Sequence, residues 1–399
     1  MQIKKILVFL FSFLNFFTSE NFPCYGQRCS VNSINQSTHT NTLASIYLQT
    51  RNTYSFRLVF HILYLNPEEK ISSAQVHSQI EILNEFFSSS TSNEDLNIPK
   101  GFRSLKSNPG FQFCLADIDP NGNPTTGIHW FPINNLSVAC QMQFGKRSIM
   151  HKTLGGVDIW DPKKYINIYI VNRDQCNALG EAIFPWDATT EEDGIILDYR
   201  TIGTIGTASN NQPFHQGKTL VHEMGHYFGL LHLSGDRSNC NGEDSVADTP
   251  SQSLEYFGCP EYPQWSCNSE SMFTNFMSLV DDPCMQFFTK LQVTRMRTII
   301  ARDRSDLLNH SCSIKPVIPL DKIRVTELDG FWQLINLEHN SWSAHFELYD
   351  ISGKLIWLDS EENIISKTIP GINMLLNPGI YFLNIYNKTS KNCFKLLKN

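Results

Sequence analysis

The sequence predicts two structural units, an α/β domain over residues 54–315 and a small all-β sandwich over residues 316–399. Strand and helix patterns alternate up to a histidine-rich helix, which is typical of an α/β domain. After Pro316 only short strand patterns remain, punctuated by glycine and proline. The chain of 399 residues is long enough for two or three domains with substantial cores.

The chain begins with a pattern typical of a secretory signal peptide. Lys4 and Lys5 form a positive start, and the stretch from Ile6 to Phe17 is apolar apart from two polar residues. This stretch is too short to span a membrane comfortably, and no later segment is long enough. We therefore expect residues 1–26 to be a signal peptide. The mature protein would be secreted or held at the cell surface, without a transmembrane segment.

Six segments before the histidine motif carry strand, helix or turn patterns. One of them has apolar residues at helical spacing, four have strand patterns, and glycine, asparagine and proline mark the remaining one as a turn. In chain order we expect a strand at Phe56–Leu65, a helix at Ala74–Phe87, a strand at Gly110–Asp119, a turn at Asn121–Pro124, and strands at Tyr165–Val171 and Gly194–Tyr199.

The motif HEMGHYFGLLH supplies three imidazoles and a carboxylate at metal-site spacing. His222 and His226 are four residues apart, so on a helix both project from one face and can share a zinc ion. Gly229 can take the left-handed conformation that ends a helix, which would bring His232 back as the third ligand. Glu223 would lie beside the metal as general base and then general acid, moving the proton of the attacking water.

Composition excludes some partners and leaves the disulfide pairing open. A formal net charge of −7 and the lack of any basic run argue against nucleic acid as a partner. Eleven cysteines in an exported chain indicate disulfides more than metal ligands. Spacing alone cannot choose among the possible pairings of the eight central cysteines. These are Cys114, Cys140, Cys176, Cys240, Cys259, Cys267, Cys284 and Cys312.

The C-terminal region reads as strands alone. Its apolar segments are short and bounded by turn residues, which favours a separate small β-sandwich. The segments are Phe346–Leu358, Gly371–Leu376 and Gly379–Asn387.

The long histidine motif resembles the zinc motif of the metzincin metallopeptidases. The segment Asn275–Ser278, with Met277, falls where those enzymes carry the methionine turn beneath the metal. This methionine packs under the histidines and is not itself a ligand. The resemblance implies a metzincin catalytic domain of α/β (α+β) class, with a twisted, mostly parallel sheet and an active-site helix. It also implies the activity of a zinc-dependent endopeptidase.

Further segments are similar to the pappalysin branch of the metzincins, which includes the ulilysin-like and cytophagalysin enzymes. The similarity runs from Cys29 to Arg297 and includes the opening strand and helix. Its other segments are Leu179–Pro185, Ala247–Pro250 and Asn275–Met296. In that branch two disulfides hold the loops between the zinc helix and the methionine turn. They would map here onto Cys240 with Cys267 and onto Cys259 with Cys284.

The same resemblance suggests a zymogen and a structural calcium ion. Relatives carry a propeptide cysteine whose thiolate fills the open zinc position until processing, and Cys29, in a short prosegment over residues 27–53, lies where it would be. A disulfide-bonded Cys29 is the alternative. Relatives also bind calcium near the zinc-site loops, where Glu243, Asp244 and Asp248 offer oxygen ligands. A solvated acidic loop explains these three residues equally well.

Two features after Met277 bear on catalysis and specificity. The branch often has a tyrosine two residues after the methionine that hydrogen-bonds the tetrahedral intermediate, whereas this chain has Leu279. The oxyanion would then be stabilised by zinc or by another donor. Asp281 and Asp282 lie near enough to the methionine turn to suggest a basic substrate side chain after the scissile bond, with a solvated acidic pair as the alternative.

The C-terminal segments resemble the sorting domain of the type IX secretion system. The order of FELYDISGKLI, LNPGIYFLNIYN and the final FKLLK carries this resemblance. It implies that the tail addresses the protein across the outer membrane through the type IX secretion machinery. An ordinary carbohydrate- or protein-binding β-module is the alternative.

Together these observations predict a secreted zinc endopeptidase that acts on protein or peptide substrates. The competing class is a catalytically silent, zinc-bearing adhesin or protein-binding module of the same fold. Glu223 favours the enzyme, because a binding module has no physical need for a base beside the metal. A zinc hydrolase acting on something other than peptides is disfavoured by the methionine turn and the third histidine.

Overall fold

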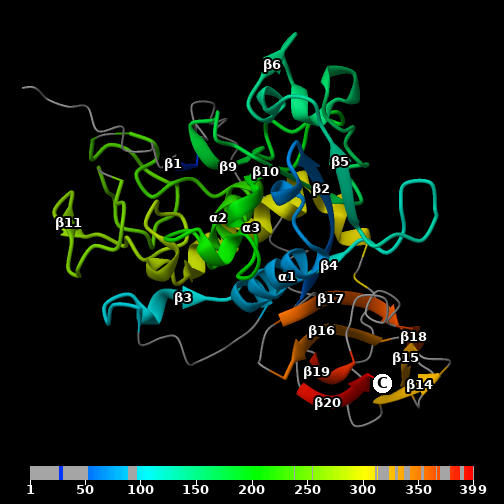
Figure 1. Ribbon diagram of the computed structural model, residues 1–399. Helices are drawn as coiled ribbons and strands as arrows, with labels where there is room; N and C mark the ends of the chain where they lie inside the picture. The colour runs from blue at the N-terminus through cyan, green and yellow to red at the C-terminus, as the bar shows by residue number, and fades with distance from the viewer. Residues whose placement is uncertain are drawn as a thin grey trace, which may run out of the picture.

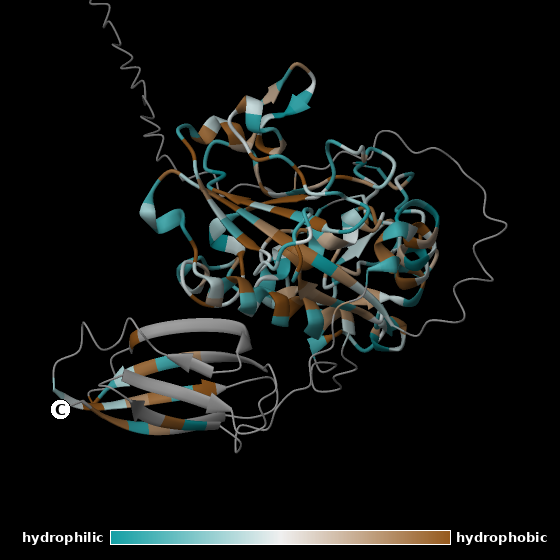
Figure 2. Cartoon of the chain, turned by 90° about the vertical axis from the view of Figure 1, so that its right-hand side faces the viewer, coloured by the Kyte–Doolittle hydropathy of each residue, from teal (hydrophilic) through white to brown (hydrophobic). Residues whose placement is uncertain are grey.

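The computed structural model contains one large mixed sheet that carries the histidine helix, and two smaller sheets near the C-terminus (Figures 1 and 2). The structure describes residues 27–29, 53–88, 97–237, 239–253, 255–310, 312, 323–328, 331–336, 342–351, 355–364, 366–368, 378–386 and 391–398. The predicted signal peptide and most of the predicted prosegment lie outside the described residues. None of the helices within those ranges is long and apolar enough to cross a membrane.

The large sheet is mostly parallel, as the family resemblance implied. Its strand order is β1-β9-β10-β8-β2-β4, and β5 also pairs with β2. Every pairing is parallel except that of β9 with β10. The strands are β1 (Gln27–Cys29), β2 (Tyr54–Tyr64), β4 (Phe111–Leu115), β5 (Ile128–Pro132), β8 (Ile166–Val171), β9 (Ala178–Ala182) and β10 (Ile195–Asp198).

The strongest sequence patterns correspond to central elements of this domain. The predicted strands at Phe56–Leu65, Gly110–Asp119, Tyr165–Val171 and Gly194–Tyr199 overlap β2, β4, β8 and β10. The predicted turn at Asn121–Pro124 is present, with the backbone N–H of Gly122 donating to the carbonyl of Asp119. Strand β9 was not predicted, because its five residues include a glycine and a glutamate and lack strand periodicity. Its position in the sheet depends on long-range pairing.

Helices α1 and α2 pack against the sheet, and a third helix, α3, joins them in the main core (Figure 1). They are α1 (Ser73–Ser88), which covers the predicted helix Ala74–Phe87, α2 (Lys218–Tyr227) and α3 (Lys290–Asp303). Side chains of β8 serve both faces, because Ile168 joins the helix-side core while Tyr169 joins the core on the opposite face. Both faces of β8 are therefore buried, which explains its nearly continuous apolar sequence.

Short strand pairs tie down the loops around this domain. They are β3 (Lys106–Ser107) with β13 (Phe288–Thr289), β6 (Met142–Gln143) with β7 (Lys146–Arg147), and β11 (Trp265–Ser266) with β12 (Ser269–Glu270). Thr289 also begins α3 through a capping box, since its hydroxyl accepts from the backbone N–H of Gln292 and the Gln292 side chain accepts from the backbone N–H of Thr289.

The described C-terminal residues form two antiparallel sheets, as the predicted β-sandwich requires. One has the order β14-β15-β18 and the other β17-β16-β19-β20. Their strands are β14 (Ile323–Leu328), β15 (Phe331–Asn336), β16 (Trp342–Asp350), β17 (Leu355–Ile364), β18 (Ser366–Thr368), β19 (Gly379–Tyr386) and β20 (Lys391–Lys398). The predicted segment Phe346–Leu358 is split between β16 and β17, and Gly371–Leu376 lies outside the described residues.

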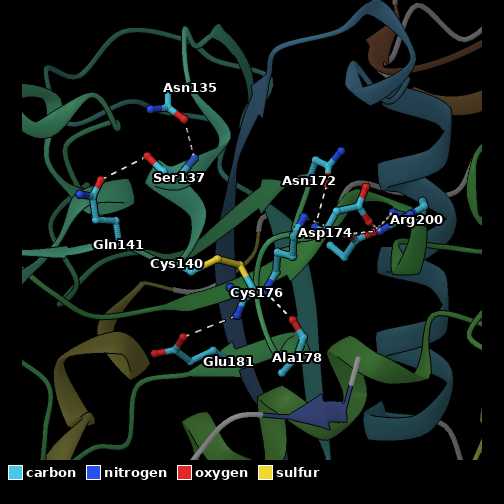
Figure 3. The surroundings of a disulfide bond; sticks show 12 residues. Asn135, Ser137, Cys140, Gln141, Asn172, Asp174, Cys176, Ala178, Glu181 and Arg200 are labelled. Atoms are coloured by element: carbon cyan, nitrogen blue, oxygen red, sulfur yellow. Dashed lines mark hydrogen bonds and ion pairs between the residues drawn. A yellow bond between two sulfur atoms is a disulfide. The ribbon is translucent and has the colours of Figure 1, made fainter. Parts of the chain in front are cut away.

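Four disulfides link the eight central cysteines. The two pairings implied by the family resemblance, Cys240–Cys267 and Cys259–Cys284, are both present. Cys114–Cys312 joins β4 to the segment after α3, across 198 residues of sequence. Cys140–Cys176 anchors the loop before β9, and Figure 3 shows this disulfide beside Ala178 and Glu181 of β9.

Candidate active site

His222, Glu223 and His226 lie on helix α2, which is buried along its whole length. Every residue of α2 is buried, and the rings of His222 and His226 lie edge to face with centroids 4.7 Å apart. The side chain of Asp282 accepts from the backbone N–H of Gln216 at 2.8 Å, just before the N-terminus of α2. A carboxylate at this end satisfies donors that the helix leaves unpaired and complements the helix dipole.

Gly229 ends the helix and directs His232 back to the site. Its φ of 87° is left-handed, and its backbone N–H donates to the carbonyl of His226 at 2.8 Å. The backbone N–H of Leu230 donates to the carbonyl of Gly225, which closes the turn. A Cβ at residue 229 would also lie 2.4 Å from the side chain of Ile299. The predicted role of Gly229 as the helix terminator is confirmed.

The three imidazoles converge through their Nε2 atoms. The distances are 3.1 Å from His226 to His222, 3.1 Å from His226 to His232, and 3.2 Å from His222 to His232. On the other side of each ring Nδ1 faces an acceptor. These acceptors are the carbonyl of Phe276 at 2.7 Å, the carbonyl of Leu230 at 2.7 Å, and Oδ1 of Asp236 at 2.5 Å.

This hydrogen bonding tests whether the residues fit a zinc ion. An acceptor can bond only to a protonated Nδ1, so each neutral ring carries its proton there and an unprotonated lone pair on Nε2. Three lone pairs that face one another cannot hydrogen-bond among themselves, whereas a cation placed between them would satisfy all three. Neutral imidazole nitrogens backed by outer acceptors are the usual ligands of catalytic zinc. The donor set therefore fits zinc.

The pKa values of His226 and His232 shift in opposite directions, although burial acts to lower both. Burial lowers the pKa of His226, which favours the neutral ring that a metal requires. At His232 burial acts in the same direction, but the hydrogen bond to Asp236 and the charges of Asp236, Glu255 and Glu223 outweigh it and raise the pKa.

Glu223 is fully buried between α2 and β9. Burial raises its pKa to about 8, against the smaller opposing effects of its contact with Cys29 and of the charges on His232 and Arg173. Its Oε1 has no hydrogen-bond partner within the described part of the chain. A Cβ at Gly180 of β9 would lie 2.4 Å from that oxygen. The glycine thus provides the space that the carboxylate occupies.

Strand β1 brings Cys29 into the same site. Its backbone pairs in parallel with β9, with Cys29 opposite Gly180. The Cys29 Sγ lies 3.7 Å from Oε2 of Glu223, and Sγ and one nitrogen of each of the three histidines all lie within 4.8 Å of one another. Among the described residues Cys29 is in no disulfide, so the alternative of a disulfide-bonded Cys29 is not what the structure shows.

Met277 lies beneath the metal-site helix, as the methionine-turn resemblance implied. A Cβ at Gly225, between the two helical histidines, would lie 2.5 Å from the Met277 sulfur. Leu279 is buried at 2% exposure, at the position where relatives often have tyrosine. Met277 therefore supports the site by packing.

The acidic residues considered for calcium or substrate binding have other partners in the structure. Asp244 is buried and accepts from the Thr249 hydroxyl at 2.8 Å, and Asp248 accepts from the Leu291 N–H at the start of α3. Neither joins Glu243 in a group of convergent ligands within the described ranges. Asp282 caps α2, as described above.

Three nearby side chains were not singled out from the sequence. Asp236 bonds His232, Phe184 lies edge to face with His226 at 5.4 Å, and the buried Arg173 donates from Nε to the carbonyl of Ala178 in β9. Only Asp236 had a local signal, since an acid four residues after a ligand histidine can reach its ring. No sequence pattern marks Phe184 or Arg173, because each is placed beside the site by the packing of β9 against α2.

Comparisons with known proteins agree on one family. The family model described as pregnancy-associated plasma protein-A, a peptidase family, matches residues 153–301. An extracellular metalloprotease of Arthroderma gypseum is 27% identical over 267 residues, which cover 65% of this chain and 76% of that protein. One of Pyricularia oryzae is 38% identical over 148 residues, which cover 36% of this chain and 50% of that protein.

Solved structures point to the same family, and the similarity covers a larger share of the compared protein. A mutant of Tannerella forsythia promirolysin is 33% identical with a TM-score of 0.60, covering 66% of this chain and 88% of that chain. Mature mirolysin of the same organism, in complex with a cleaved peptide, is 33% identical with a TM-score of 0.59, covering 64% of this chain and 96% of that chain.

Proposed function

Because this chain belongs to the pappalysin family of metzincins and is a zinc metalloendopeptidase, we propose that His222, His226 and His232 hold the zinc ion and that Glu223 is the catalytic base. One observation carries this assignment. Three Nε2 atoms meet at 3.1–3.2 Å while each Nδ1 faces an acceptor on the outer side of its ring. A cation placed between the three Nε2 atoms would satisfy all three lone pairs, which supports the proposal.

The chemistry of peptide hydrolysis divides between the metal and Glu223. A zinc ion supplies Lewis acidity, which polarises the carbonyl of the scissile bond and lowers the pKa of a nearby water. Glu223 takes a proton from the attacking water at Oε1, for which the described residues provide no hydrogen-bond partner, and then passes it to the amine of the leaving peptide. Gly180 and the walls of the buried site hold this carboxylate in place.

The test of this assignment is cleavage of a diverse peptide library by the processed enzyme and by its Glu223→Ala variant. Zinc content is measured on both proteins. We expect one zinc ion per chain in both, and cuts made only by the unaltered enzyme. Equal cleavage by the two proteins would contradict the role of Glu223. Silence from both with zinc bound would instead favour a non-catalytic binding protein.

The position of Cys29 supports a latent form of the enzyme. As a thiolate it would complete the metal's coordination through the prosegment, and strand β1 would also cover the edge of β9. Removal of residues 27–53 would free both the open coordination position of the metal and the edge of β9. In the unprocessed protein we expect Cys29→Ala to raise peptidase activity several-fold. If that variant stays as inactive as its parent while the processed enzyme is active, the thiol is not the inhibitory group.

Freeing β9 also suggests how a peptide binds. Strand β9 lies at the edge of the large sheet once β1 is gone, and an exposed edge strand can pair with an extended peptide. Mature mirolysin, the structural neighbour, was solved in complex with a cleaved peptide. A protein or peptide substrate is therefore the proposed partner of this site. A basic side chain after the scissile bond remains a prediction, which cleavage of matched Leu and Arg peptides would decide.

Export and the C-terminal unit complete the proposal. We infer secretion directed by residues 1–26 and passage through the type IX machinery directed by residues 316–399. The family relatives named as extracellular metalloproteases support an extracellular location. Deleting residues 316–399 should leave the protein inside the outer membrane, as fractionation with an antibody would show.

Calcium at Glu243, Asp244 and Asp248 also stays a prediction, tested by the melting temperature with and without EGTA.

A further inference from the structure

One of the three metal-site histidines has a charged partner on its outer side. Nδ1 of His222 and of His226 each face a neutral backbone carbonyl at 2.7 Å, whereas Nδ1 of His232 faces the carboxylate of Asp236 at 2.5 Å. His232 is also the ligand that lies beyond the end of α2, so the helix does not hold its ring. The histidine with the least backbone support therefore has the strongest hydrogen-bond acceptor.

The backbone makes an unusual turn to place this carboxylate. Gly235 and Asp236 have consecutive left-handed conformations, with φ of 60° and 56°. The backbone N–H of Gly235 donates to the carbonyl of His232 at 2.9 Å, which folds the chain back over the histidine. A side chain at residue 235 would lie 2.6 Å from the carbonyl oxygen of Glu243. Such a conformation is costly for residues other than glycine, asparagine and aspartate, and it persists because surrounding contacts enforce it.

A second carboxylate supports the first through a serine. The backbone N–H of Asp236 donates to Ser234 Oγ at 3.1 Å, and that hydroxyl in turn donates to Oε1 of Glu255. The other oxygen of Glu255 is buried and has no hydrogen-bond partner within the described residues. Ligand atoms of His232, Asp236 and Glu255 all lie within 4.8 Å of one another. Two negative groups therefore stand behind one imidazole.

From this geometry we propose that Asp236, supported by Ser234 and Glu255, is a positioning residue that orients His232 and strengthens it as a metal ligand. The inference rests on the proposed function, in which His232 binds zinc. An anionic acceptor fixes the Nδ1–H tautomer and increases electron density on Nε2, which tightens metal binding. The short contact between Nδ1 and Asp236 is a hydrogen bond, so this nitrogen is not available to a second metal ion.

The decisive variant is Asp236→Asn, because asparagine tolerates the left-handed backbone and keeps an acceptor oxygen but removes the charge. Zinc dissociation constants of the full chain are measured by competition with a chromophoric chelator and repeated in a Cys29→Ala background. Glu255→Gln tests the second carboxylate. Asp306→Asn is the matched control, since Asp306 is an exposed carboxylate paired with Lys163 at 3.4 Å.

We expect Asp236→Asn to weaken zinc binding about tenfold or more, Glu255→Gln to weaken it less, and Asp306→Asn to leave it unchanged. The melting temperature of the metal-free proteins should stay the same, and the visible spectrum of the cobalt-substituted Asp236→Asn protein should shift. A zinc affinity within twofold of the parent would overturn the inference. So would a second zinc ion per chain that is lost in Glu255→Gln.

A further variant separates this inference from the proposed function. His232→Ala must lose most of the zinc affinity if His232 is a ligand. Unchanged affinity in His232→Ala would mean that the ligand assignment itself is wrong. Loss in His232→Ala with none in Asp236→Asn would overturn only the positioning role of Asp236.

Discussion

Adding one methyl group at Gly180 should misplace the carboxylate of Glu223, the proposed catalytic base, and leave the proposed metal site intact. A Cβ there would lie 2.4 Å from Oε1 of Glu223 and 2.8 Å from its Cγ and Cδ, whereas ordinary van der Waals contact begins at 3.4 Å. The strand cannot yield easily, because residue 180 pairs with β10 on one side. Glu223 must therefore move by about 1 Å, away from the position in which it meets the water.

A displacement of this size has a predictable kinetic cost. Misplacement of a catalytic group by about 1 Å lowers the rate about a hundredfold, which corresponds to about 2.7 kcal/mol of transition-state stabilisation. We expect Gly180→Ala to reduce kcat by about that factor, with little change in KM. The histidines lie on α2 and the loop after it, so zinc should remain at one ion per chain.

The assay is cleavage of a quenched fluorescent peptide by the processed enzyme, with zinc measured on the same samples. Gly101→Ala is the matched control, because a Cβ at residue 101 would approach no described atom closer than 3.7 Å. That variant should keep full activity. Activity of Gly180→Ala within threefold of the parent, with zinc bound, would refute the argument that Gly180 holds Glu223 in place.

Two further predictions concern stability and use the free energy of unfolding from urea titrations. Asp193 and Arg304 form a buried ion pair in which Nη2 of Arg304 donates to Oδ1 of Asp193 at 2.9 Å. Asp193→Asn should therefore lower the free energy of unfolding by about 3 kcal/mol, whereas Asp303→Asn, in an exposed pair with Arg302, should lower it by less than about 1 kcal/mol. Equal losses in the two variants would contradict the argument from burial. Burial lowers the pKa of His61 from 6.5 to about 4, so its contribution to stability is complete above pH 6.5 and is lost as the pH falls towards 4, a change of about 3 kcal/mol. A His61→Phe variant should show a flatter pH dependence over this range, and an unchanged slope would contradict this.

Much of the site could be predicted because its spacing is local. His222 and His226 are four residues apart, so they lie on one face of any helix that contains them. Gly229 marks the end of that helix because glycine readily adopts the left-handed backbone conformation. The class of the domain followed from alternating strand and helix patterns. The two disulfides between the zinc helix and the methionine turn followed from the family resemblance, not from spacing.

The environment of that site required the tertiary structure. Cys29 and Glu223 are 194 residues apart, and no local pattern shows that a strand pairs beside Gly180 and brings the thiol to the histidines. The acids near the methionine turn illustrate the same limit. Asp282 accepts from the backbone N–H of Gln216 just before α2, a contact across 66 residues that no local pattern predicts.

The sequence by itself predicted the candidate metal-ligand set, the helix that carries it and the class of the fold, because each depends on interactions within a few residues along the chain. Only the tertiary structure decided which charges are buried, that Glu255 stands behind Asp236 and His232, and what covers the edge of β9. Those properties depend on contacts between distant segments. Burial and hydrogen bonding change the energy of each charged group far more than its sequence neighbours do.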